Sequence, residues 1–124
     1  MSAAGGPAPR PGITIATGRP RPDVRLVALA GELDMATAPR VREQLRRQPP
    51  DPPVLVLDLT AVTFLGGAGI TVVLEAAQAV PGGLQVVIAP DGPVRRAFRV
   101  TGVDRVLSLH SDLDDALAAA ALQD

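Results

Sequence analysis

The sequence predicts a single α/β domain whose mixed, mostly parallel sheet has four to five strands and about four helices. Two observations lead to this prediction. After an initial pair of strands, strand-like and helix-like segments alternate along the rest of the chain. Two of the strand-like segments, 54–59 and 84–89, are almost continuously apolar, which is typical of central strands covered on both faces. The length of 124 residues fits one domain.

The N-terminal part begins with a segment rich in Gly and Pro. We expect residues 1–12 to form a disordered leader and residues 13–124 to form the domain. A first short strand is expected over 13–17, where apolar residues alternate with polar or small ones. The two prolines within 18–23 are expected to end that strand. A second strand is expected over 24–30, because its alternate residues are apolar.

Two helices flank the first continuous apolar run. Thr37 is placed to cap the first of them, and the proline-rich segment 49–53 ends it. The second begins after the Gly66–Gly69 segment and runs to about Val80. Its surface is apolar almost all round, so we expect it to be largely buried.

The C-terminal part predicts two further helices with a short strand between them. Pro93 opens the first of these helices, and Gly102 ends it. The short strand is expected over 106–109. Ser111 and Asp114 have the spacing of a capping box, which would open the last helix.

The composition excludes most catalytic chemistry. The chain has no Cys and one His, and its 12 basic residues are all Arg. Thiol nucleophiles, metal sites rich in Cys or His, and catalytic lysines are therefore excluded. We expect a protein that is not an enzyme and that needs no cofactor. The net charge of −1 and the low aromatic content of 2% argue against binding to DNA or RNA.

The sequence gives no sign of export or of membrane insertion. The N-terminal segment lacks the apolar stretch of a secretory signal. No run reaches the roughly 18 apolar residues of a membrane span. We expect a cytoplasmic protein, and the sequence leaves its oligomeric state open.

Three features each have two interpretations. Gly66–Gly69 joins a strand to a helix, where a glycine loop could hold phosphate on helix N–H groups. It lacks the lysine of a Walker motif and the third glycine of a dinucleotide fingerprint, so a tight turn with close strand–helix approach is favoured.

Asp58 could be a functional carboxylate, but the favoured interpretation is that it accepts hydrogen bonds from nearby backbone N–H groups. For His110, an exposed or helix-end position is favoured over catalysis.

Arginines gather on two of the predicted helices and could bind phosphate or an acidic protein. They are Arg40, Arg42, Arg46 and Arg47 on the first helix, and Arg95, Arg96 and Arg99 on the third. Because aromatic residues are not interleaved with them, solvated helix faces are the favoured interpretation.

Three segments carry a family resemblance. They read GELDMATAP at 31–39, VLVLDLTAVTFL at 54–65 and PVRRAFRVTGVD at 93–104. In this order and spacing they resemble the STAS domain, the family of bacterial anti-sigma factor antagonists. The likeness covers most of the chain, from about Val24 to Leu122. It implies the α/β fold that the order of elements predicts, and a protein-binding role in place of catalysis.

The resemblance implies partner switching. Typical family members capture an anti-sigma factor, which frees a sigma factor and turns on transcription. The anti-sigma factor is often a serine kinase of the ATPase-like type, which phosphorylates the antagonist and shuts it off. Partner-binding residues are therefore expected on two loops and at the start of a helix. They are Asp34, Met35, Thr37, Gly66, Gly67, Ala68, Gly69 and Thr71. For Asp34, a role in forming the turn is an equal alternative.

The chain departs from the family pattern at the expected switch. After the Phe-Leu pair, family members usually carry Asp-Ser-Ser/Thr-Gly, with the first hydroxyl residue as phosphoacceptor. Here Gly66, Gly67, Ala68 and Gly69 stand at these positions. Gly67 has no oxygen to modify, so we expect a domain that phosphorylation does not switch there. A Gly cap costs only a few tenths of a kcal/mol relative to Ser, so the fold is expected to survive.

A second function also fits the resemblance. STAS-like folds include domains that bind nucleotides or apolar molecules. In this chain, the glycine turn together with Arg95 and Arg96 could hold a phosphate. That interpretation predicts a sensor or adaptor domain that binds a small ligand or a nucleotide.

Overall fold

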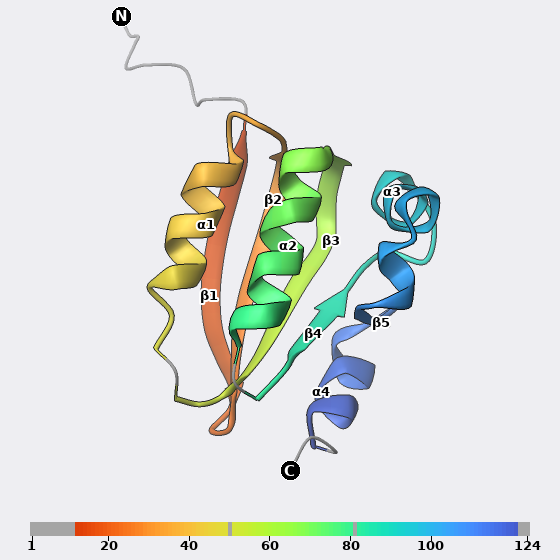
Figure 1. The fold of residues 1–124 in the computed structure, drawn as a ribbon. Coiled ribbons are helices and arrows are strands. Elements are labelled where there is room, and N and C mark those ends of the chain that lie inside the picture. Colours follow the sequence, from red (N-terminus) through yellow and green to blue (C-terminus); the bar gives the residue numbers. More distant parts are fainter. Residues whose placement is uncertain (1–11, 50, 81, 122–124) are drawn as a thin grey trace, which may run out of the picture.

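A five-stranded sheet forms the centre of the protein (Figure 1). The computed structural model describes residues 12–49, 51–80 and 82–121. The strands follow the order of the sequence across the sheet, and only the first pair is antiparallel. They are β1 (Ile13–Arg21), β2 (Val24–Leu33), β3 (Val54–Leu65), β4 (Leu84–Val87) and β5 (Ser108–His110). The predicted single α/β domain with a mixed, mostly parallel sheet is confirmed.

Four α-helices connect and follow the parallel strands. Figure 1 shows α1 and α2 side by side across one face of the sheet. A short 3₁₀ helix, η1 (Val103–Arg105), lies between the third α-helix and the last strand. The α-helices are α1 (Ala38–Arg46), α2 (Gly67–Ala79), α3 (Pro93–Thr101) and α4 (Leu113–Ala121). None of the helices in the described part of the chain has the length and apolar character needed to cross a bilayer.

The sheet has a core on each face. Leu55 and Leu57 of β3 point into the larger core, which α1, α2 and α3 cover. The alternate residues Val54 and Val56 point into a smaller core, where Ala116 of α4 packs against them. Successive side chains of a strand lie on opposite faces, so an unbroken apolar run needs cover on both sides. The apolar run at 54–59 predicted a strand covered on both faces, and this prediction is confirmed.

The prediction that the first strand ends before residue 18 is wrong. β1 continues to Arg21 and pairs with β2 along most of its length, with a register shift between Gly18 and Arg21. Pro20 lies within it. β1 is an edge strand, and an edge strand tolerates a residue without an N–H because one side of its backbone faces away from the sheet.

The C-terminal part differs from the prediction in two details. The last strand begins at Ser108 and not at Val106, because η1 takes up the residues after α3. The expected capping box on Ser111 is replaced by a cap one residue later: Asp112 Oδ1 accepts the N–H of Asp115 at 2.8 Å. A carboxylate at this position accepts a free N–H of the first turn as well as a serine does.

The leader expected over residues 1–12 lies outside the described residues, apart from Gly12. The carbonyl of Gly12 accepts the N–H of Glu32 at 2.9 Å, which continues the pairing of β1 with β2 by one residue. Both β2 and β3 run past their predicted ends at 30 and 59, to Leu33 and Leu65. These extensions bring the two strands to the edge where the candidate site lies.

Candidate functional site

The predicted site residues meet at the carboxyl ends of β2 and β3. The two strands are parallel, and Leu33 and Leu65 stand opposite each other at their ends. The loop after β2 and the turn after β3 therefore leave the sheet side by side. A hydrogen bond joins them, since the N–H of Gly66 donates to the carbonyl of Leu33 at 3.0 Å. Residues separated by about 30 positions in the sequence thus share one edge of the sheet.

Asp34 organises the loop that follows β2. Its Oδ1 accepts the backbone N–H groups of Ala36 at 2.9 Å and of Thr37 at 3.0 Å. The hydroxyl of Thr37 donates to the carbonyl of Glu32 at 2.7 Å and accepts the N–H of Asp34 at 3.0 Å. Thr37 stands at the N-cap of α1, but its side chain makes no capping bond to the helix. The predicted side-chain cap is therefore wrong, and Thr37, which is buried, holds the loop against the end of β2.

Asp34→Ala is expected to lower the free energy of unfolding by about 1 kcal/mol, because two loop N–H groups lose their acceptor. Asp34→Asn is expected to keep most of that stability, since its Oδ1 accepts the same two bonds. Urea denaturation of both variants measures the difference. Equal stability of the Ala and Asn variants would contradict the turn-forming role of Asp34.

Two large apolar side chains are exposed beside these loops. Met35 is 82% exposed and Phe64 is 49% exposed. The ring of Phe64 lies against Gly66, 3.2 Å from the place that a Cβ would occupy. Both side chains are therefore available for contact with another protein. The predicted site residues included Met35 but not Phe64. The sequence held a signal for Phe64, because one of only two aromatic residues in the chain stands just before the Gly66–Gly69 segment.

The glycines of the turn have different structural roles. Gly69 packs tightly: a Cβ there would lie 2.7 Å from Leu33 Cγ and 2.8 Å from Leu65 Cδ1. The favoured interpretation of a close strand–helix approach is therefore confirmed at Gly69. Gly67, the first residue of α2, has no atom within 4 Å of its Cβ position and is exposed. A side chain at Gly67 would meet no steric obstacle.

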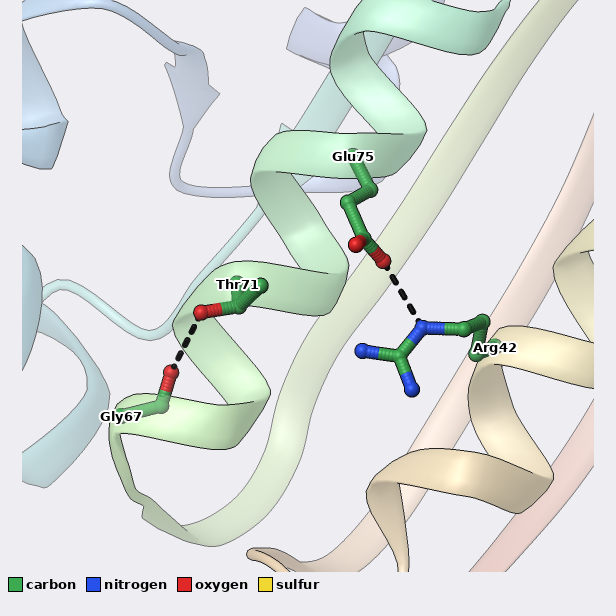
Figure 2. A network of polar contacts seen from close by, with 4 residues as sticks. All are labelled: Arg42, Gly67, Thr71 and Glu75. Atoms are coloured by element: carbon green, nitrogen blue, oxygen red, sulfur yellow. Dashed lines mark hydrogen bonds and ion pairs between the residues drawn. The ribbon is translucent and has the colours of Figure 1, made fainter.

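Thr71 and Ala68 complete the predicted set on α2. The hydroxyl of Thr71 donates to the carbonyl of Gly67 at 3.1 Å, one helical turn earlier (Figure 2). Thr71 is exposed, while Ala68 is half-buried. The exposed members of the set are therefore Met35, Gly67 and Thr71, while Asp34, Gly66 and Ala68 are half-buried and Thr37 and Gly69 are buried.

Asp58 and His110 have structural partners. Asp58 Oδ1 accepts the N–H of Thr60 at 2.9 Å and its hydroxyl at 2.8 Å, which confirms the favoured interpretation. His110 lies in β5 and is half-buried, so the helix-end position expected for it is wrong. Its Nε2 is 2.7 Å from Oε1 of Gln85, a buried residue of β4.

Several arginines of α1 tie that helix to its neighbours. Arg40 donates to the carbonyl of Ile13 in β1 at 2.7 Å. The Nε of Arg42 lies 2.8 Å from a carboxylate oxygen of Glu75 and so joins α1 to α2 (Figure 2). Arg40 is exposed, as the solvated helix face predicts, whereas Arg42 is half-buried and paired, so that expectation is wrong for Arg42. In the described ranges, no group of His, Asp and Glu is arranged to hold a metal ion.

Comparison with known proteins agrees with the fold. A family model of the STAS domain matches residues 18–116. The chain belongs to the STAS domain family. The match includes both loops of the candidate site and the strands that carry them.

The relatives of this STAS domain include anti-sigma factor antagonists. The anti-sigma-F factor antagonist RsfB of Mycobacterium tuberculosis is 32% identical over 96 residues, which is 76% of this chain and 79% of that protein. The crystal structure of an anti-sigma factor antagonist from Mycobacterium paratuberculosis has a TM-score of 0.81 and 35% identity, over 88% of this chain and 94% of that one. The phosphorylated form of SpoIIAA from Bacillus shares the fold, with a TM-score of 0.59 and 14% identity over 86% of this chain and 98% of that one.

Proposed function

We propose that this STAS domain is an anti-sigma factor antagonist that acts in the cytoplasm without enzymatic activity. It binds an anti-sigma factor, and the sigma factor released in this way becomes free to direct transcription. The observation that carries the proposal is the likeness to antagonists at 32% and 35% identity, over three quarters or more of this chain. The exposed edge at the ends of β2 and β3 supports it, since it offers a surface for a protein partner.

The proposed interface combines two exposed apolar side chains with exposed backbone at the start of α2. Met35 and Phe64 offer large apolar side chains, and such side chains provide much of the binding energy at interfaces. Next to Phe64, Gly66 and Gly67 leave the backbone open to a partner at the start of α2, and the exposed Thr71 lies one turn further along. The buried Gly69 acts indirectly, by letting α2 approach the strands. Asp34 can offer its remaining acceptor capacity to the partner, while Thr37 acts indirectly by holding the loop.

We further propose that phosphorylation at position 67 does not regulate this antagonist. A phosphate adds about −1.5 to −2 charges, which disrupt an apolar protein interface through repulsion and the cost of desolvation. Gly67 has no hydroxyl that could carry one. The hydroxyl of Thr71 lies one turn further along α2 and bonds the backbone at Gly67. The complex with an anti-sigma factor is therefore constitutive, even where that partner is a serine kinase of the ATPase-like type.

The test is a binding assay in the presence of ATP. The protein is mixed with an anti-sigma factor kinase from its own cell, and complex formation is followed by gel filtration while intact mass reports phosphate. We expect a stable complex and no added phosphate on the natural chain. The Gly67→Ser variant is expected to gain one phosphate and leave the complex, because its side chain fits the open space at this position.

Two outcomes would contradict the proposal at different levels. Failure to bind any anti-sigma factor of the same cell, with folding verified by circular dichroism, would refute the antagonist function. A phosphate on the natural chain at Thr71, accompanied by release of the partner, would refute the unswitched behaviour and leave antagonism intact.

A further inference from the structure

A cavity of about 530 Å³ lies between the C-terminal halves of α1 and α2. Its floor includes Arg25 and Leu55, which stand near the beginnings of β2 and β3. The candidate partner site is at the other ends of these strands, and none of its residues lines the cavity. The volume falls within the range of about 300 to 1,000 Å³ that small-molecule sites occupy. Neither the glycine turn nor Arg95 and Arg96 contribute to it.

The lining is apolar with a cationic excess. Leu45, Val72 and Val80 belong to its apolar wall. Pro49, Pro52 and Pro53 of the α1–β3 loop extend this wall. Three arginines, Arg25, Arg42 and Arg46, line the cavity together with one acidic residue, Glu75. The lining therefore carries an excess of positive charge next to apolar surface. A ligand that matches it has an apolar body and one anionic end.

Arg25 and Arg42 each have donors to offer to such an anion. The Nε of Arg25 is shielded from solvent and has no hydrogen-bond partner within the described part of the chain. An atom this shielded is also out of reach of a ligand, so a bound anion would meet the terminal nitrogens of the Arg25 guanidinium. Arg42 uses its Nε on Glu75, and Figure 2 shows its two terminal nitrogens turned away from that carboxylate.

We propose that this cavity binds a free carboxylate that carries an alkyl chain. The carboxylate would lie at Arg25, with Arg42 and Arg46 near the opening, and the chain would pack along Leu45, Val72 and the loop prolines. This proposal does not depend on the anti-sigma factor function. The same chemistry occurs at the surface of an anionic membrane, but an open cavity between two helices favours a single free molecule.

Decanoate is the probe for the test, with 1-decanol as its uncharged match in calorimetric titration. We expect saturable one-to-one binding of decanoate, and binding of decanol about tenfold weaker or less, because it cannot form charge-assisted bonds to arginine. Arg25→Met keeps the apolar stem and removes the donors, and it is expected to weaken decanoate binding about tenfold. Arg47→Met is the control, since Arg47 pairs with Glu43 on α1 and does not line the cavity.

Ala79→Phe places a large side chain at the lining from an exposed position of α2 and is expected to abolish binding without unfolding the protein. Unchanged binding in Ala79→Phe would overturn the proposal, because decanoate would then bind elsewhere. Equal affinity for decanoate and decanol, or equal effects of Arg25→Met and Arg47→Met, would overturn the role of the arginines. Co-sedimentation with vesicles of anionic phospholipid, without binding of decanoate, would overturn the assignment to a free carboxylate.

Discussion

Gly67→Asp is expected to weaken binding of the anti-sigma factor by about 30-fold or more and to leave the fold intact. Gly67 lies at the centre of the proposed interface, and an unpaired charge buried there costs about 2 to 5 kcal/mol. The fold tolerates the change for two reasons. No atom lies within 4 Å of the Cβ position, and an acidic residue at the start of α2 interacts favourably with the helix dipole. Calorimetric titration measures the affinity, and thermal melting verifies the fold.

Gln78→Glu is the matched control for this prediction. Gln78 is exposed on the same helix, about three turns from Gly67, so the variant adds an equal charge outside the proposed interface. Its affinity for the partner is expected to equal that of the natural chain. If Gly67→Asp binds as tightly as the control, Gly67 does not lie in the interface.

Gly69→Ala is expected to destabilise the protein by about 1 to 3 kcal/mol, the usual cost of overpacking a core. The added methyl group would meet the side chains of Leu33 and Leu65 at 2.7 and 2.8 Å, and the carbonyl of Leu33 at 2.9 Å. The backbone carbonyl cannot move without disturbing the end of β2. Urea denaturation gives the free energy of unfolding, and the melting temperature is expected to fall by several degrees.

The neighbouring variant Gly67→Ala serves as the comparison. Its methyl group enters open space on the first turn of the same helix. Because alanine has fewer backbone conformations than glycine in the unfolded chain, the variant is expected to be more stable by about 0.4 to 1 kcal/mol. The two substitutions are chemically identical and two residues apart, yet opposite in their expected sign. If both variants were as stable as the natural chain, the close approach of α2 to β2 and β3 would not constrain position 69.

Much of the fold was predictable because its determinants are local. The apolar run of β3 required cover on both faces, and the first three α-helices begin and end near prolines and glycines in the sequence. The sequence could also predict that the Asp34 loop lies beside the Gly66 turn, because parallel neighbouring strands end at the same edge of a sheet. These are consequences of periodicity and topology, which a single sequence carries.

The details that escaped prediction depend on distant partners. Thr63 and Phe64 are both exposed, because irregular pairing of β2 with β3 interrupts the alternation that a regular strand would show. The hydroxyl of Thr37 bonds a carbonyl five residues earlier, which only the path of the loop determines. The pair of Arg42 and Glu75 joins residues 33 apart, and the cavity beside it depends on the spacing of two helices. No local pattern encodes such distances.

The unobstructed position at Gly67 has a consequence for observing the molecule at work. The chain contains no cysteine, so Gly67→Cys would give the protein a single thiol at the proposed contact surface. A fluorescent label attached there would report the arrival and departure of a partner in real time, without competing thiols and without strain on the backbone. The position that we propose to be free of regulation by phosphorylation is therefore also easy to label.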